Sequence, residues 1–255
     1  MHTGQTTEHF DVAFLAINAF FLFFAGLVYY LRREDKREGY PLVEEGAGRL
    51  SDGIYPATPP KKTYLLQDGS TLTLPREPNE RTLALKAVAG IREGAPFVPT
   101  GNPLRDAVGP ASYAQRQDHP DETWEGEARI VPLRVAKDFW IDPNDPDVRG
   151  WEVVAADGKV AGTVKEAWID RAEPQVFYYE VAIAGGQVVL LPARLAVIDD
   201  DANKVLVESI TAAQFADVPR LKNPNQITLL EEDKISGYFA GGHLYATPDR
   251  QEPIV

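Results

Sequence analysis

Two groups of acidic side chains are the residues of this chain whose types and spacing could carry chemistry. Asp170 and Glu173 lie in one short turn, together with Arg171. Clustered carboxylates attract protons, and a like-charged neighbour raises a carboxyl pKa toward neutral pH. Arg129 and Arg171 would oppose that shift. The other group falls within ten residues of the chain and comprises Asp118, His119, Asp121, Glu122, Glu125 and Glu127.

These groups have two interpretations that the sequence leaves open. The first is a solvated acidic loop, which is what a run of like charges usually forms. The second is a surface that collects protons and passes them on. The candidate proton-transfer residues are Asp170, Glu173, Glu125, Glu127 and His119.

Other kinds of site find little support in the sequence. The chain has no Cys, and the spacing of its four His fits no zinc motif. It contains no Gly-rich phosphate loop and no nucleophile elbow. The net charge of −12 repels phosphate backbones, which argues against a nucleic-acid partner. We therefore expect no catalytic residue, no metal and no cofactor on this chain.

A membrane-spanning helix is expected over residues 12–31 (VAFLAINAFFLFFAGLVYYL), which contain no charge. Twenty residues rising ~1.5 Å each span ~30 Å, the thickness of the hydrocarbon core. A signal peptide would have its basic residues before the apolar run, but here they follow it. The positive-inside rule then places residues 1–11 in the periplasm and the bulk of the chain in the cytoplasm.

Polar residues of this helix have alternative roles. Asn18 bonds either to its own helix backbone or to a partner helix, and we slightly favour the partner. Tyr30, Arg32 and Arg33 either contact anionic lipid head groups or only determine the topology.

Residues 32–115 form a membrane-exit and docking segment. More than half of the 20 prolines lie between residues 41 and 120, so long helices and central strands are excluded there. We expect extended chain laid on a large partner. A short hairpin is expected from residues 63–66 and 71–74 around Gly69.

Residues 116–255 predict a mostly-β globular domain that ends with a short helix. Apolar runs separated by Gly, Asp and Asn turns predict a small antiparallel barrel or sandwich. Thr228 and Glu231 form a capping box that begins a helix, and Gly241-Gly242 are expected to end it after about Ala240. The expected strands are residues 151–155, 160–169, 176–184, 187–191, 195–198 and 205–210.

Several blocks of this sequence resemble the heavy (H) subunits of purple-bacterial photosynthetic reaction centres. They are residues 30–42 (YLRREDKREGYPL), 99–103 (PTGNP) with 108–113 (VGPASY), and 229–238 (LLEEDKISGY) with 240–242 and 244–246. The blocks occur in the expected order and extend over nearly the whole chain. Residues 149–208 resemble the PRC-barrel domain that this family contains.

The resemblance implies an accessory subunit of a light-driven electron-transfer complex in the bacterial inner (intracytoplasmic) membrane. Such a subunit caps the cytoplasmic face of the L and M subunits, stabilises the complex and assists proton transfer to the secondary quinone. Bacteriochlorophyll, bacteriopheophytin, quinones and non-haem iron belong to L and M, and none to the heavy subunit. Membrane lipids, an antenna ring and a cytochrome are further candidate partners.

Residue by residue, the acidic pair of the family's proton-delivery region matches Asp170 and Glu173. The family's histidine pair for proton uptake, where transition metals inhibit, falls at Glu125 and Glu127. This departure argues against inhibitory metal binding there, although carboxylates still take up protons. Phe177 stands where some relatives have a basic residue.

Two other functions compete with this one. A membrane-anchored PRC-barrel assembly or binding module without a photosynthetic role would have no reason to share the membrane-exit and C-terminal blocks. A membrane-tethered enzyme would need a catalytic constellation, which the sequence does not offer.

Overall fold

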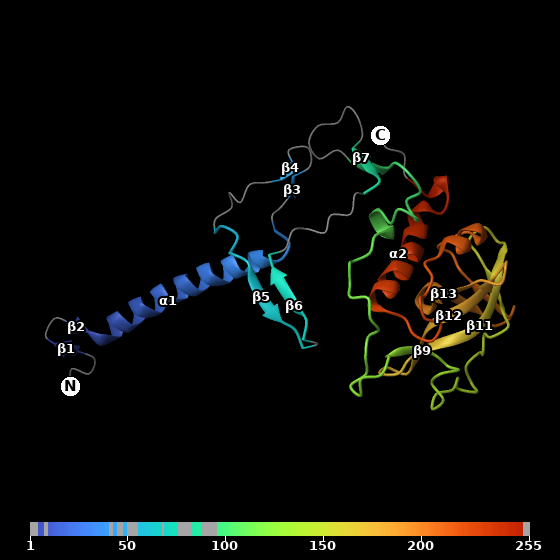
Figure 1. The fold of residues 1–255 in the computed structure, drawn as a ribbon, viewed down its shortest axis with the longest axis horizontal. Helices are drawn as coiled ribbons and strands as arrows, with labels where there is room; N and C mark the ends of the chain where they lie inside the picture. Colours follow the sequence, from blue (N-terminus) through green and yellow to red (C-terminus); the bar gives the residue numbers. More distant parts are fainter. Residues whose placement is uncertain are drawn as a thin grey trace. The chain divides into compact units, whose positions relative to one another are not determined.

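The computed structural model describes residues 5–7, 10–40, 43–44, 48–49, 56–67, 69–75, 83–87 and 96–251 (Figure 1). They belong to two compact units, Met1–Thr82 with Val88–Pro96 and Leu83–Ala87 with Phe97–Val255. The first unit is built on one long helix, and the second on a seven-stranded sheet and a shorter helix. The predicted class, one N-terminal apolar helix and a mostly-β domain with a short C-terminal helix, is confirmed.

Helix α1 (Val12–Glu34) begins at Asp11, whose carboxylate accepts hydrogen bonds from the N–H groups of Ala13 (2.9 Å) and Phe14 (3.4 Å). None of its residues is buried, and apolar side chains such as Leu22, 76% exposed, surround it on all sides. A helix that is apolar all round needs lipid or other protein around it. Val12–Arg37 is accordingly a candidate membrane span, by length and composition.

The side chain of Asn18 forms a hydrogen bond within α1. Its side-chain amide donates a 2.7 Å hydrogen bond to the carbonyl of Phe14, one turn earlier. This is the first of the two roles considered above, and it makes the residue tolerable in an apolar helix without a partner.

Two cationic side chains directly after α1 bind backbone carbonyls of a later segment of the chain. In the 3-10 turn η1 (Asp35–Arg37), buried Lys36 donates to the carbonyl of Pro56. Arg37 donates to Glu34 (2.7 Å) and to the carbonyl of Pro60 (2.8 Å).

The predicted hairpin follows this segment. It consists of β5 (Lys62–Leu65) and β6 (Thr71–Leu74), and starts one residue earlier than expected. Asp68, in its expected turn, lies outside the described residues. The other two-stranded pairs are β1 (Gln5–Thr7) with β2 (Phe10–Asp11), β3 (Val43–Glu44) with β4 (Gly48–Arg49), and, in the second unit, β7 (Leu85–Ala87) with β8 (Phe97–Pro99).

The large sheet has the order β13-β12-β11-β10-β15-β14, and β9 also pairs with β11. All its pairs are antiparallel except β10 with β15. Each predicted strand is present, although the segments predicted at 151–155, 195–198 and 205–210 are shorter than expected. The strands are β9 (Ile130–Pro132), β10 (Glu152–Val154), β11 (Val160–Asp170), β12 (Gln175–Ile183), β13 (Val188–Pro192), β14 (Val197–Asp199) and β15 (Lys204–Leu206).

This sheet must curl, because its two outer strands are consecutive in the chain. Only the 3-10 turn η3 (Ala193–Leu195) and one residue connect β13 to β14. Five residue steps reach at most ~18 Å, whereas six strands laid flat would place the outer two ~24 Å apart. The connection therefore bends the sheet toward a barrel.

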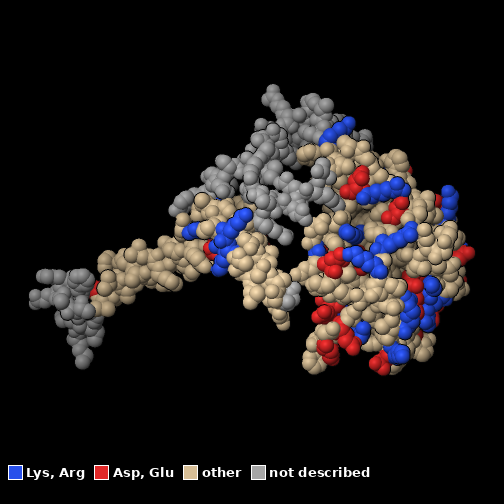
Figure 2. All heavy atoms as spheres, in the orientation of Figure 1, with Lys and Arg blue, Asp and Glu red and all other residues tan. Residues whose placement is uncertain are grey.

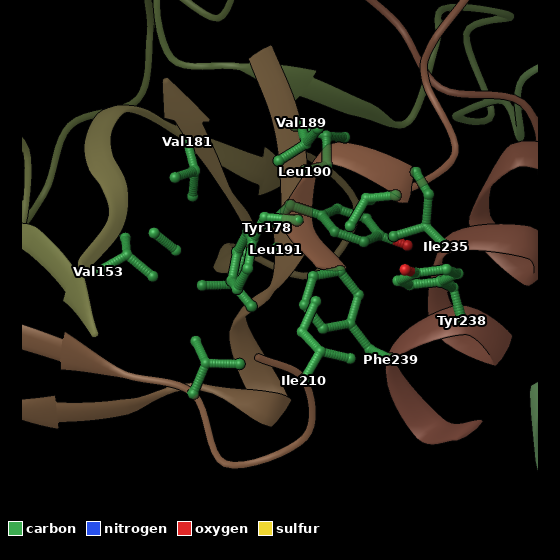
Figure 3. Packing of buried hydrophobic residues seen from close by; sticks show 14 of the residues in the cluster. Val153, Tyr178, Val181, Val189, Leu190, Leu191, Ile210, Ile235, Tyr238 and Phe239 are labelled. Atoms are coloured by element: carbon green, nitrogen blue, oxygen red, sulfur yellow. The ribbon is translucent and has the colours of Figure 1, made fainter. Parts of the chain in front are cut away.

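The core lies between the curled sheet and α2 (Leu229–Tyr245), which covers it from the side. Figure 3 shows Ile235, Tyr238 and Phe239 of α2 directed toward Tyr178 and Leu191 of the sheet. All five are at most 3% exposed. The Tyr238 hydroxyl donates to the carbonyl of Gln214 (2.9 Å), within the turn η4 (Ala212–Asp217).

The start of α2 is secured by its predicted capping box and by an upstream loop. Thr228 and Glu231 exchange the two reciprocal hydrogen bonds of the box. The first two N–H groups of the helix, those of Leu229 and Leu230, have no partner within the helix. They donate to the carbonyls of His119 (3.0 Å) and Gln117 (3.2 Å). Because the helix N-terminus is satisfied by backbone of the 117–119 loop, that loop is held against it.

The predicted end of α2 is wrong, since the helix continues through Gly241-Gly242 to Tyr245. These glycines provide close contact instead of a stop. A Cβ on Gly241 would lie 2.4 Å from the Cβ of Ala111, and one on Gly242 would lie 2.3 Å from the carbonyl oxygen of Ser209.

Part of the Pro-rich segment packs on the chain's own helix. Leu104, Val108 and Ala111 are buried, and Gly237 approaches the carbonyls of Ala111 and Ser112. The turn η2 (Gly109–Ala111) holds the segment there. Some of the apolar residues expected to dock on another protein therefore serve the fold of the second unit.

The Gly242→Ala substitution is expected to destabilise the chain by roughly 2 kcal/mol, because the added methyl meets backbone that cannot move aside. At an open helix position the same change would stabilise by up to about 1 kcal/mol. The exposed Ala240→Gly variant is the control and should lose about 1 kcal/mol. Thermal unfolding of the full chain in detergent measures both, and a stabilised Gly242→Ala variant would contradict the close packing.

Candidate functional site

The predicted acidic residue Asp170 lies at the end of β11 and is paired with Arg129. Its side chain is 1% exposed, and the Arg129 guanidinium bonds to it through Nε (2.9 Å) and Nη2 (2.7 Å). The Asp170 carboxylate also accepts the N–H groups of Ala172 (2.8 Å) and Glu173 (3.1 Å). A buried carboxylate with this many donors is held in its ionised form.

Burial alone would raise the pKa of Asp170. The Arg129 guanidinium and the N–H groups of Glu173 and Ala172 outweigh burial and keep that pKa below its usual value. The hydrogen bond to Asp170 likewise raises the pKa of Arg129 above its usual value. Asp170 therefore contributes a fixed negative charge at neutral pH.

Strand pairing brings these distant residues together. β9 pairs with the end of β11, so Ile130 lies opposite Asp170 and Arg129 precedes it. Arg129 also contacts Asp121 (3.3 Å) and, more loosely, Glu173 (3.8 Å), whose side chain is 70% exposed. Asp121, Asp170 and Glu173 thus surround one guanidinium, and we call these four residues the Arg129 cluster.

Glu125 and Glu127 lie beside the Arg129 cluster, on a turn at the surface. The N–H of Gly126 bonds to the carbonyl of Thr123 (2.9 Å) and closes this turn. Glu127 forms an ion pair with Arg171. Both glutamates line an open hollow of about 960 Å³ that also reaches Arg129 and Arg171. Glu125, Glu127 and the Arg129 cluster therefore share one surface.

His119 does not join these carboxylates. Its ring nitrogens contact the side chain of Gln117 (2.7 Å) and the carbonyl of Pro120 (2.8 Å). Its backbone carbonyl instead anchors α2, so the structure supports a positional role for this residue.

Glu232 is the titratable group that the sequence did not single out. The pKa of Glu232 is raised to about 7, and burial is the largest cause. The charges of Asp121 and Asp233 act in the same direction as burial, while those of Arg116 and Arg129 act against it. Asp121 and Arg129 belong to the Arg129 cluster, so Glu232 lies within the field of that cluster. The local sequence places Glu232 in the first turn of a helix, where the ionised form is favoured, and shows no sign of this burial.

A cation lies near Phe177 despite the absence of a basic residue at that position. The guanidinium of Arg194 lies over the Phe177 ring, 5.5 Å from its centre. Arg194 belongs to η3, so the positive charge beside Phe177 comes from an element other than the strand that carries Phe177.

The cations at the end of α1 divide into two kinds. Lys36 and Arg37 are held by the chain itself, as described above. Tyr30 and Arg32 are exposed and Arg33 is half-buried; Arg32 lies 3.8 Å from Asp35. Figure 2 shows an uncharged surface along α1 and Lys and Arg gathered at its end. Tyr30, Arg32 and Arg33 are thus the residues available to head groups.

Within the described ranges, no group of three or more His, Asp or Glu side chains has a geometry that could hold a metal ion. Many of the carboxylates of the acidic surface are engaged by Arg or by backbone N–H groups. The arrangement can hold negative charge in place and exchange protons at Glu232.

Comparison with protein families gives two matches. The pattern described as "Photosynthetic reaction centre, H-chain N-terminal region" matches residues 4–135, slightly more than half of the chain. The PRC-barrel domain matches residues 144–214, which include β10 to β15. The two matches follow each other along the chain without overlap.

Arg129→Gln should destabilise the chain by about 3 kcal/mol at pH 7, because it leaves the Asp170 carboxylate buried without its cation. The folded pKa of Asp170 is below its unfolded value, so the pair's contribution is present above pH ~4 and is lost as the pH falls further. The cost of Arg129→Gln should therefore shrink toward low pH. Adding Asp170→Asn should restore part of the loss.

Chemical unfolding of the full chain in detergent at pH 7 and pH 3 measures these differences. Arg105→Gln, which breaks an exposed pair with Asp217 (2.7 Å), is the matched control and should cost at most about 1 kcal/mol. An equal cost for the two variants at pH 7 would refute the special role of the buried pair.

Glu232→Gln is expected to stabilise the chain above neutral pH. The folded pKa of about 7 exceeds the ordinary value of 4.5, so the folded state binds more protons between these values and stability falls as the pH rises through them. The neutral amide of glutamine does not titrate, so it avoids this loss of stability. The free energy of unfolding at pH 8 should therefore rise by roughly 1 kcal/mol, after allowance for solvent screening. Thermal unfolding at pH 4.5 and pH 8 tests this, with exposed Glu152→Gln as control. A Glu232→Gln effect of equal size at both pH values would show that the residue does not titrate in this window.

Proposed function

This chain belongs to the photosynthetic reaction-centre H-chain family and carries a PRC-barrel domain, and from that membership we propose that it caps the cytoplasmic face of the L and M subunits and assists proton transfer to the secondary quinone. The observation that carries the proton role is the contrast between Asp170, held ionised by Arg129, and Glu232, whose pKa is about 7.

Two features support the proposed assembly role. The apolar surface of α1 is uncovered in the chain alone and would pack against lipid and the companion subunits. Trp124 and Trp140 are 93% and 78% exposed, which is unusual for tryptophan and typical of interface anchors. We propose that these side chains become buried in the complex.

Glu232 is the proposed proton carrier. A group whose pKa lies near the working pH is protonated about half of the time. It can therefore both accept and release a proton at a small cost in free energy. Glu125, Glu127 and Glu173 lie at the surface and would attract protons from solution. Asp170 does not relay protons in this scheme. Its fixed charge raises the proton affinity of nearby groups, in partial opposition to Arg129.

The proposal assigns no redox cofactor to this chain. Bacteriochlorophyll, bacteriopheophytin, quinones and non-haem iron would belong to L and M, and an antenna ring and a cytochrome are further proposed neighbours. The proposed location is the bacterial inner membrane, with the N-terminus periplasmic and the second unit cytoplasmic, as the basic residues after α1 favour. Tyr30, Arg32 and Arg33 would contact anionic head groups.

Purification from native membranes in mild detergent tests the assembly role. Two companion membrane subunits and the near-infrared bands of bacteriochlorophyll are expected to accompany the chain. If the chain comes alone and colourless, the assembly proposal fails, and a PRC-barrel binding module without a photosynthetic role takes its place.

The proton role is tested by flash-induced kinetics of the second electron transfer to the quinone in the intact complex. Asp170→Asn with Glu173→Gln should slow this step about tenfold, since a unit charge lost near the path shifts proton affinities by about one pKa unit. Glu232→Gln alone should slow the second electron transfer at pH 7. The difference between its rate and the wild-type rate should change with pH around 7. Glu152→Gln is the control. Rates equal to those of wild type in both variants would remove these residues from the proton path.

A further inference from the structure

A pocket of about 470 Å³ opens on the second unit between strands β11 to β13 and the loop of residues 220–225. Its volume is within the range of sites that bind small molecules. None of the residues of the Arg129 cluster lines it, and neither does Glu232. It is therefore a place separate from the acidic surface described above.

The acid on the wall of this pocket is already neutralised. Glu180 is 4% exposed, and its carboxylate accepts hydrogen bonds from the indole N–H of Trp168 (3.0 Å) and from Arg134 (2.7 Å). The Arg134 guanidinium also donates to the carbonyl of Pro224 (2.5 Å), which holds it beside the pocket. The Glu180–Arg134 pair thus adds no net charge.

Two cations at the pocket remain without an acidic partner. The other lining acid, Glu166, lies 3.5 Å from Arg149. Lys165 is exposed and Arg220 bonds only to the neutral amide of Gln187, so neither has a carboxylate partner within the described part of the chain. In a chain of net charge −12, this is a local excess of positive charge.

The remaining lining is apolar except for Asn225. Val188 and Leu190 lie on the same face of β13 as the lining residue Glu180 of β12, with which Leu190 is paired. Leu221 is half-buried in the 220–225 loop. An apolar interior with cations at its edge suits a ligand that has an apolar body and a negative head. A neutral apolar molecule would leave the cations unused, and an inorganic anion would leave the walls in water.

We propose that this pocket binds a small organic anion, with its carboxylate or phosphate head between Lys165 and Arg220 and its apolar body against Val188, Leu190 and Leu221. The ligand is a drug-sized soluble molecule, because the volume is too small for both chains of a phospholipid. This proposal rests on the pocket alone and does not depend on the proton role.

Isothermal titration of the full chain in detergent with 1-naphthaleneacetate tests the proposal, with the same titration into detergent alone subtracted. One molecule per chain should bind saturably. The neutral 1-naphthaleneacetamide, of nearly the same shape, should bind at least about tenfold more weakly, since each charge-assisted hydrogen bond is worth a factor of that order.

The Lys165→Gln/Arg220→Gln variant should lose about tenfold or more in affinity for the naphthaleneacetate. Both residues are exposed, so this variant should fold. Lys61→Gln/Lys137→Gln removes two exposed cations that do not line the pocket and should bind like the wild type. Absence of saturable binding by the wild type, equal affinity for the neutral amide, or unchanged affinity in Lys165→Gln/Arg220→Gln would each overturn the proposal.

Discussion

The ion pair between Arg129 and Asp170 is the interaction on which the acidic surface depends. Asp170 is enclosed by protein, and a carboxylate at such a depth is tolerated only with a cation and further hydrogen bonds around it. Arg129 fills that requirement and thereby fixes the loop that precedes β9 against the end of β11. Its remaining N–H groups reach Asp121 and Glu173. One guanidinium thus sets both the position and the charge of several carboxylates that are distant in the sequence.

Helix α2 completes the surface because of how tightly it is seated. Gly241 and Gly242 allow it to approach Ala111 and Ser209 at distances that no other residue permits, while carbonyls of the 117–119 loop receive its first N–H groups. The contact with the 117–119 loop brings Asp121, two residues after His119, within electrostatic reach of Glu232. The pKa of Glu232 therefore results from tertiary packing, since both its burial and its acidic neighbour come from the seating of the helix.

Features that depend on local pattern could be predicted from the sequence. An uninterrupted apolar run identified α1, turn residues separated the strands, and Thr228 with Glu231 marked the start of α2. The end of α2 could not be found this way, because Gly241-Gly242 would terminate a helix in solvent but here occupy space that neighbours have closed. The pairing of Arg129 with Asp170 spans 41 residues and depends on strand register. For Glu232 the local signal, a helix N-terminus, favoured the ionised form, and burial reversed it.

On the proposed function, Glu125 and Glu127 stand where the family resemblance implies a histidine pair, and this surface would have to take up protons near neutral pH without imidazole. Residue type alone does not explain such uptake, because an ordinary glutamate is ionised near pH 7, whereas an ordinary imidazole, with a pKa of about 6.5, is partly protonated. Environment explains it better. Burial brings the pKa of Glu232 to about 7, close to that of an imidazole, while hydrogen bonds keep the pKa of Asp170 low. Two carboxyl groups whose environments separate their pKa values can serve as carrier and fixed charge. On the proposed function, a surface made of carboxylates therefore needs no histidine, provided that α2 keeps Glu232 half-buried and within reach of the charge of Asp121.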